Sequence, residues 1–160
     1  MAYLENLHAP LPCQYTNLCA VCQAQLRIMK VRYPKPGIVY KGAIPVAEIA
    51  LNTSDKYLTI LISALLGNAY KFTQEGTISL ECDRLGDDRV FVAVADTGCG
   101  IPPEKHGYVF ERFTKLDPFS QGNGLGLYLC RLIVTHLHGE IYIDSGYTGG
   151  TRIVAILPRR

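Results

Sequence analysis

The sequence lacks the features that mark membrane-spanning, exported or nucleic-acid-binding chains. Its formal net charge is only +2, and its basic residues are scattered rather than clustered, so no nucleic acid partner is indicated. The longest apolar stretch, residues 58–66, is about half of the roughly 20 residues that a bilayer span requires. No export signal is visible at the N-terminus. These absences predict a cytoplasmic segment that makes no membrane contact.

Internal repeats and low-complexity segments are missing as well, and what remains is typical of a single globular domain. The chain has 160 residues, of which 48% are hydrophobic and 19% charged. This is enough for one domain with a substantial core, and hardly enough for two.

The six cysteines do not form a pattern that indicates disulfides. A chain of this size and apolar content needs no disulfide framework, so reduced thiols are expected. Cys19 and Cys22 are spaced as CxxC, but no second pair follows. The run around them has helical character, which favours small packing residues over a metal or redox site.

Helical spacing of apolar residues appears in the first and last thirds of the chain. We expect one helix to be capped by Thr16 and to run to Met29, with a buried apolar stripe. Another helix is expected from Leu125 to about His138, where Gly139 would end it.

The clearest helix lies between these two. Thr53 or Ser54 can cap it, and Asp55 is favourably placed in its first turn. Its apolar positions follow the i, i+3, i+4, i+7 spacing of a buried helical face. They are Leu58, Leu61, Ile62, Leu65, Ala69 and Phe72.

Strand patterns alternate with these helices without a strict order. Residues 37–51 contain short β-branched runs that suit strands near a sheet edge. Residues 77–82 and 90–96 are expected to form one hairpin, and residues 140–145 and 151–157 a second. The mixture predicts an α+β fold, a two-layer sandwich with helices on one face of a mixed, largely antiparallel sheet.

Two stretches place polar residues where a site could form. In GNAYKFT, Asn68 and Lys71 share one edge of the central helix, where an amide could bind Mg²⁺ and an ammonium could balance phosphate, or both could simply be solvated. In VAVADTGCGIP, a buried strand ends in Asp96, followed by Gly98 and Gly100. A carboxylate there needs a partner, such as the exocyclic amine of adenine, although capping of a local turn explains it equally well.

Two further stretches follow. VFERFTKLD carries Phe110 and Phe113 as possible anchors, with Arg112 and Lys115 available for phosphate, although an aromatic core with surface charge also explains it. QGNGLGLYLC has glycines at alternate positions before the last helix, but neither a strand before it nor a Gly-Lys-Ser/Thr ending. It therefore fits neither a dinucleotide fingerprint nor a phosphate-binding P-loop. The remaining interpretation is a flexible loop that brings backbone N–H groups and the start of a helix to an anion.

Together and in this order, the four stretches closely resemble the ATP-binding catalytic (HATPase_c) domain of two-component sensor histidine kinases, within the GHKL superfamily of gyrase, chaperone, histidine kinase and mismatch-repair ATPases. The resemblance covers about residues 14–158. GNAYKFT is similar to the family's N box, DTGCGIP to its G1 box, FERF to its F box and GNGLGL to its G2 box. GGTRIVAILP resembles the closing hairpin.

The resemblance implies ATP and Mg²⁺ as cofactors and assigns roles to matching positions. Asn68 would bind Mg²⁺, Lys71 would contact phosphate, and Asp96 would accept from the adenine amine. Thr151 would support the adenine through water, and Lys115 would reach the terminal phosphate. Asn68 and Lys115 are thus the expected catalytic residues. The remaining expected ATP-binding residues are those of the G1 box and of the hinge of an ATP lid: Gly98, Gly100, Gly122, Gly124, Leu125 and Gly126.

Two positions depart from the family pattern. Ala64 lies four residues before Asn68, where many members have asparagine and the hydrolysing relatives have glutamate. Asn123 stands where threonine is frequent. Neither change removes a phosphate or adenine contact.

None of the four histidines is followed by an acidic residue, as the family's phosphoacceptor is. We therefore expect residues 1–13 to be the remnant of a dimerisation helix and its linker, and residues 14–160 to be the catalytic domain of a longer kinase. The implied activity is transfer of the γ-phosphoryl group of ATP to a histidine on a separate dimerisation domain, with a response regulator downstream. Any membrane anchor would belong to other parts of the parent. A related serine kinase or regulatory ATPase, or a nucleotide-dependent interaction module, stays open.

Overall fold

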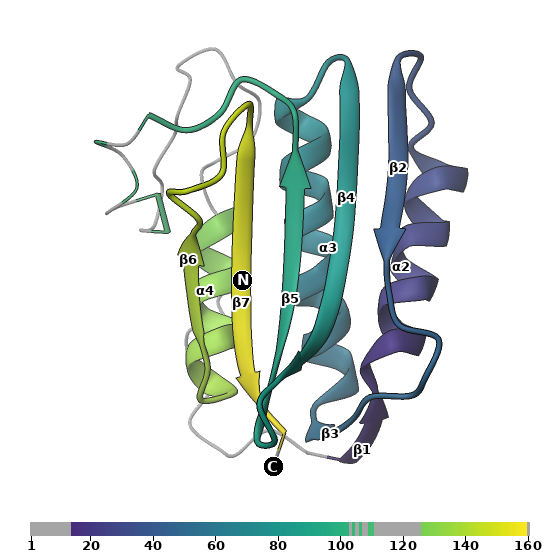
Figure 1. Ribbon diagram of the computed structural model, residues 1–160, viewed down its shortest axis with the longest axis vertical. Helices are drawn as coiled ribbons and strands as arrows, with labels where there is room; N and C mark the ends of the chain where they lie inside the picture. The colour runs from purple at the N-terminus through teal and green to yellow at the C-terminus, as the bar shows by residue number, and fades with distance from the viewer. Residues whose placement is uncertain (1–13, 103, 105, 107–108, 111–125, 160) are drawn as a thin grey trace.

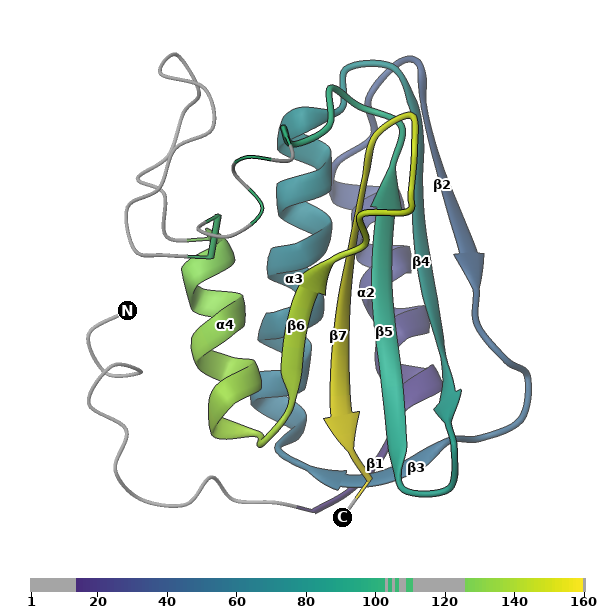
Figure 2. The ribbon, with the colours of Figure 1, turned by 60° about the vertical axis from the view of Figure 1, so that its left-hand side comes forward.

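The computed structural model describes residues 14–102, 104, 106, 109–110 and 126–159. One face of a five-stranded sheet is covered by three helices, and the other face has no helix over it in this part of the chain (Figure 1). Figure 2 shows the two layers from the side. The predicted α+β sandwich is therefore confirmed. The helices are α2 (Leu18–Arg32), α3 (Asp55–Phe72) and α4 (Gly126–His136).

The large sheet has the strand order β2-β4-β5-β7-β6. β2 runs parallel to β4 at one edge, and the other neighbours are antiparallel. β1 and β3 form a separate antiparallel pair. The bounds are β1 (Gln14–Asn17), β2 (Ile38–Ala43), β3 (Ala50–Thr53), β4 (Gly76–Leu85), β5 (Arg89–Asp96), β6 (Glu140–Ile143) and β7 (Thr151–Pro158). Both predicted hairpins, β4–β5 and β6–β7, are present.

The start of α2 differs from the prediction. Thr16 belongs to β1, where it pairs with Leu51, and the cap is Asn17, whose side chain accepts a hydrogen bond from the backbone N–H of Cys19 at 3.1 Å. The pairing of β1 with β3 keeps the chain extended up to Asn17, so the helix begins later. It also continues beyond Met29 to Arg32, shortly before Pro34, which cannot extend it.

The central helix α3 agrees closely with its pattern. Ser54 is the cap, since its hydroxyl accepts from the N–H of Tyr57 at 3.4 Å. Five of the six predicted apolar positions are buried, and Phe72 is only partly buried. Cys19 and Cys22 are buried as free thiols, so the packing interpretation of the CxxC pair is confirmed, and Cys82 and Cys130 are buried free thiols as well. No helix among the described residues is long and apolar enough to cross a membrane.

The end of α4 has a different cap from the one expected. The helix stops at His136, and His138, not Gly139, adopts the left-handed conformation with a φ of 63°. The N–H of Gly139 then closes the turn on the carbonyl of Val134 at 2.8 Å. Glycine is required at 139 for another reason, because a Cβ there would overlap the carbonyl oxygen of Ile156 in β7.

Replacing Gly139 by alanine is expected to lower the free energy of unfolding by about 1–3 kcal/mol, because the added methyl group would push α4 and β7 apart. Gly67 on α3 is the matched control, since nothing lies within 4 Å of the position of its Cβ. Gly67→Ala should raise stability by up to about 1 kcal/mol. Urea unfolding followed by circular dichroism measures both, and a G139A variant as stable as the wild type would contradict the close approach.

Candidate functional site

A cavity of about 650 Å³ lies where β5 ends, β7 begins and α3 terminates. This volume is within the range of small-molecule sites, roughly 300–1,000 Å³. Its lining combines one aromatic ring with loop residues that expose much backbone. They are Phe72, Gly98, Cys99, Gly100, Ile101, Pro102, Gly149 and Gly150.

Asp96, the last residue of β5, lies buried beside this cavity with 4% of its surface exposed. Its Oδ1 accepts a hydrogen bond from the backbone N–H of Gly98 at 2.9 Å. Burial raises the pKa of Asp96, and hydrogen bonds from the backbone of Gly98 and Thr151 oppose that rise. A carboxylate can accept about four hydrogen bonds, so Asp96 retains acceptor capacity for the amine of a bound group.

Glycines bring three backbone segments into contact at this end of the sheet. A Cβ at Gly98 would overlap the carbonyl oxygen of Phe72, and a Cβ at Gly150 would overlap that of Asp96. Gly150 also has a φ of 152° and Gly100 a φ of 76°, which side chains rarely allow. The walls of the cavity are therefore built largely of backbone, and a ligand can approach peptide groups directly.

One buried hydroxyl at the site has no protein partner. Thr73, the C-cap of α3, is fully buried, and its Oγ1 is the single buried side-chain polar atom without a hydrogen bond in the described part of the chain. It lies 2.9 Å from the position that a Cβ on Gly98 would take. Buried polar atoms are rarely left unpaired, and this one lies where the segment after β5 closely approaches the end of α3.

The last turn of α3 carries the predicted phosphate and metal residues. Asn68 is partly buried and lies one turn before Phe72, which lines the cavity. Lys71 is exposed, with its Nζ 5.5 Å from the centre of the Phe72 ring. The end of this helix is held by Lys35, whose Nζ donates to the carbonyl of Thr73 at 3.1 Å. Both predicted residues thus lie at the cavity end of α3.

The remaining predicted residues are distributed as follows. Thr151 is buried at the start of β7 and pairs directly with Asp96, while Gly98 and Gly100 line the cavity. Gly126 is the exposed first residue of α4. Four predicted positions lie outside the described residues: Lys115, Gly122, Gly124 and Leu125.

Sequence reasoning missed several residues of this site. Phe72 was assigned to the core because it continues the apolar stripe of α3, although it lines the cavity instead. Gly149 and Gly150 belong to the stretch that resembles the closing hairpin, and no role at the site was predicted for them. The signal that could have identified them is the glycine pair directly before a buried strand, since adjacent glycines often mark a close backbone approach. Tyr147 was also missed; its hydroxyl donates to the carbonyl of Asp96 at 3.1 Å.

The fold is a two-layer sandwich with a cavity of small-molecule size at the end of β5. The chain belongs to the histidine kinase-, DNA gyrase B- and HSP90-like ATPase family, whose sequence model matches residues 53–160. It is an ATP-binding catalytic domain with homology to sensor histidine kinases.

Individual relatives agree with this assignment. The chain is 32% identical over 159 residues to the adaptive-response sensory kinase SasA of Gloeothece citriformis, covering 96% of this chain and 40% of that protein. The mycobacterial sensor histidine kinase MprB superposes with a TM-score of 0.79 at 24% identity, over 92% of this chain and 98% of that one. Full-length ShkA in complex with AMPPNP gives a TM-score of 0.84 at 24% identity, over 98% of this chain and 33% of that one. These two structural matches establish the fold, and the chain spans less than half of the SasA sequence.

We expect the wild-type protein to gain stability relative to Asp96→Asn as the pH falls from neutral into the acid range. The pKa of Asp96 is raised by burial above its ordinary value of 3.8, so the folded state holds this proton more tightly than the unfolded chain. The contribution of Asp96 to the free energy of unfolding is fully present below its pKa in the unfolded chain, and it is lost as the pH rises through its pKa in the folded protein. Urea unfolding of both proteins across this pH range measures the difference, and parallel stability curves would show that Asp96 does not titrate as described.

Proposed function

We propose that this domain is the catalytic part of a sensor histidine kinase and transfers the γ-phosphoryl group of ATP to a histidine on a separate dimerisation domain. The observation that carries the proposal is the buried carboxylate of Asp96 beside a glycine-walled cavity, in a chain of this ATPase family. The sensory kinases among its relatives favour histidine as the acceptor.

The chemistry of the cavity suits an adenine nucleotide. Asp96 would accept a hydrogen bond from the exocyclic amine, and Thr151, its partner across the sheet, would support the ring through water. Gly98 and Gly100 allow the base to approach the backbone after β5. A base in this position would bury polar groups, which strengthens their hydrogen bonds relative to water.

The residues at the end of α3 fit a magnesium nucleotide. Asn68 offers a hard amide oxygen, the type of ligand that Mg²⁺ accepts. The described residues contain no group of three or more histidine, cysteine or acidic side chains that could hold a metal, so Asn68 would bind the ion together with phosphate oxygens. When bound, Mg²⁺ would neutralise phosphate charge. Lys71 would add a positive charge there, and Lys115 would do so at the terminal phosphate.

The acceptor and the further partners would lie on other parts of the parent protein. Residues 1–13 would be the remnant of the dimerisation helix and linker, and residues 14–160 the catalytic domain. His136 ends α4 and His138 occupies the turn after it, and neither is followed by the acidic residue that follows the family's phosphoacceptor. Neither position suits a phosphoacceptor. A response regulator would receive the phosphoryl group downstream.

Asp96 is expected to make the protein select ATP over GTP. Guanine presents a carbonyl where adenine presents an amine, so two acceptors would face each other in a desolvated site. An unpaired buried polar group costs about 1–3 kcal/mol, and GTP should bind about tenfold to a hundredfold more weakly. Calorimetry measures both affinities, with Asp96→Asn as the comparison, since its amide can donate to guanine. Equal affinities in the wild type would remove Asp96 from the adenine site.

Phosphate release by this chain alone should be very slow, because Ala64 stands one helical turn before Asn68, where the hydrolysing relatives carry glutamate. Loss of a general base typically lowers a rate by about 10²–10⁴. With saturating Mg²⁺ and ATP, the chain should bind nucleotide, leave itself unlabelled and label a dimerisation domain supplied from its own parent.

The control for this assay is Asn68→Ala, which should abolish labelling of the supplied domain. Turnover to free phosphate at about 1–10 per second, abolished by the same substitution, would identify water as the acceptor and favour a regulatory ATPase. Nucleotide binding without labelling of any domain and without hydrolysis would favour an interaction module. Labelling of serine instead of histidine would identify a related serine kinase.

A further inference from the structure

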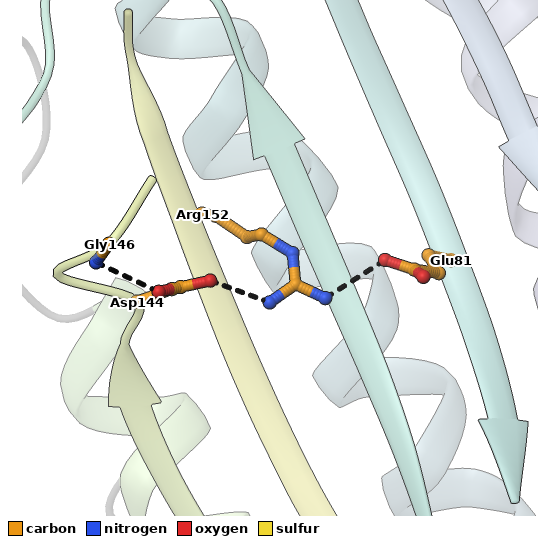
Figure 3. Close-up of polar contacts among 4 residues, drawn as sticks. All are labelled: Glu81, Asp144, Gly146 and Arg152. Atoms are coloured by element: carbon orange, nitrogen blue, oxygen red, sulfur yellow. Dashed lines mark hydrogen bonds and ion pairs between the residues drawn. The ribbon is translucent and has the colours of Figure 1, made fainter. Parts of the chain in front are cut away.

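A polar network on the uncovered face of the sheet connects β7 to β4, which is distant in sequence, and to the turn that follows β6. The guanidinium of Arg152 on β7 donates through Nη1 to Oδ2 of Asp144 and through Nη2 to Oε1 of Glu81 on β4, each at 2.9 Å. Figure 3 shows the arginine side chain lying across β5 to reach Glu81, with Asp144 on its other side. One cation thus joins β4 to the segment that follows β6.

The strand between these partners makes this reach possible. On β5, Ala95 pairs with Arg152, and the next residue on that face, Ala93, pairs with Glu81. Two methyl side chains leave space above β5 for the long arginine stem. Arg152 keeps 23% of its side chain exposed, and Glu81 keeps 42%. Partly solvated ion pairs contribute little to global stability, so the network is better suited to fixing a local geometry than to holding the fold.

Asp144 is the first residue after β6, and its hydrogen bonds organise the turn between β6 and β7. Its Oδ1 accepts from the N–H of Gly146 at 3.0 Å (Figure 3). Its own N–H donates to the carbonyl of Arg152 at 2.8 Å, and its carbonyl accepts from the N–H of Tyr147 at 3.2 Å. The carboxylate therefore organises the turn with one oxygen and is held by the arginine with the other.

The same turn forms one wall of the cavity. Tyr147 donates its hydroxyl to the backbone carbonyl of Asp96 at 3.1 Å. Gly149 and Gly150 line the cavity, and Gly150 is in backbone contact with Asp96. A displacement of Asp144 would therefore move the cavity wall and loosen the end of β5.

We propose that Arg152 is a positioning residue for the nucleotide site: anchored on Glu81, it holds Asp144 and thereby places the β6–β7 turn, with Tyr147, Gly149 and Gly150, against Asp96. Arg152 itself reaches toward the face of the sheet that the helices do not cover, and it acts through the turn. The proposal rests on the nucleotide-binding function proposed above, and it adds a second layer of residues that sets the affinity for ATP.

Arg152→Met is the direct test, because it keeps the long apolar stem and removes the guanidinium. Calorimetry with ATP should show binding about three- to tenfold weaker than the wild type, the range typical of coupling between residues in one network. Arg89→Met is the matched control: its ion pair with Glu140, at 3.6 Å on the same sheet, involves no residue that lines the cavity. Arg89→Met should leave ATP affinity unchanged.

A double-mutant cycle separates positioning from general loss of structure. Tyr147→Phe is made in the wild type and in the Arg152→Met background, and urea unfolding of every variant is measured beside ATP affinity. If the arginine acts through the turn, Tyr147→Phe should weaken ATP binding less in the Arg152→Met background than in the wild type. Arg152→Lys should restore part of the affinity, since an ammonium can still pair with Asp144.

Three results would overturn the proposal. The first is an ATP affinity that is unchanged in Arg152→Met. The second is an ATP affinity that falls only in proportion to global stability. The third is strictly additive effects of Arg152→Met and Tyr147→Phe on ATP affinity. A wild-type chain that binds no ATP would be a different outcome, because it would overturn the nucleotide-binding function itself and the positioning role with it.

Discussion

Direct contact between backbone segments at the end of β5 is the constraint on which the rest of the site depends. The carbonyls of Phe72 and Asp96 lie where side chains at Gly98 and Gly150 would have to be. Three segments from separate parts of the sequence can meet there only because glycine adds no Cβ. Their meeting buries Asp96 and leaves the cavity beside it, so one packing requirement produces both the buried acceptor and the space that a ligand needs.

The two layers of the fold contribute to this end of the molecule in different ways. From the helical layer, α3 brings the polar edge of its last turn, and Lys35 holds its terminus through the carbonyl of Thr73. From the sheet, β5 brings Asp96, and the turn before β7 brings the facing wall. The uncovered face of the sheet contributes as well, since Arg152 is connected to that wall through Asp144. The site is thus a joint product of local helix chemistry and long-range strand pairing.

Most of the fold and part of the site could be predicted from local sequence patterns. The apolar stripe and the Ser54 cap of α3, both hairpins, and the strand that ends in Asp96 depend on neighbours close in sequence, and they could be predicted. The cap at Asn17 could not, because it follows from pairing of β1 with β3, more than thirty residues away. The role of Phe72 and the contacts of Tyr147 and Arg152 likewise arise from partners brought together only in the folded sheet.

The distribution of thiols has a chemical consequence. Burial raises the pKa of Cys19 to about 11 and that of Cys130 to about 12, and Cys22 and Cys82 are equally enclosed. Thiolates are the nucleophilic form of cysteine, so Cys19 and Cys130 are poor targets for alkylating reagents, and burial shields Cys22 and Cys82 from such reagents. Cys99 is the exposed thiol among the described residues, and it lines the cavity. The protein therefore carries a built-in chemical reporter at the wall of its cavity, whose alkylation rate would register whether the space beside it is filled.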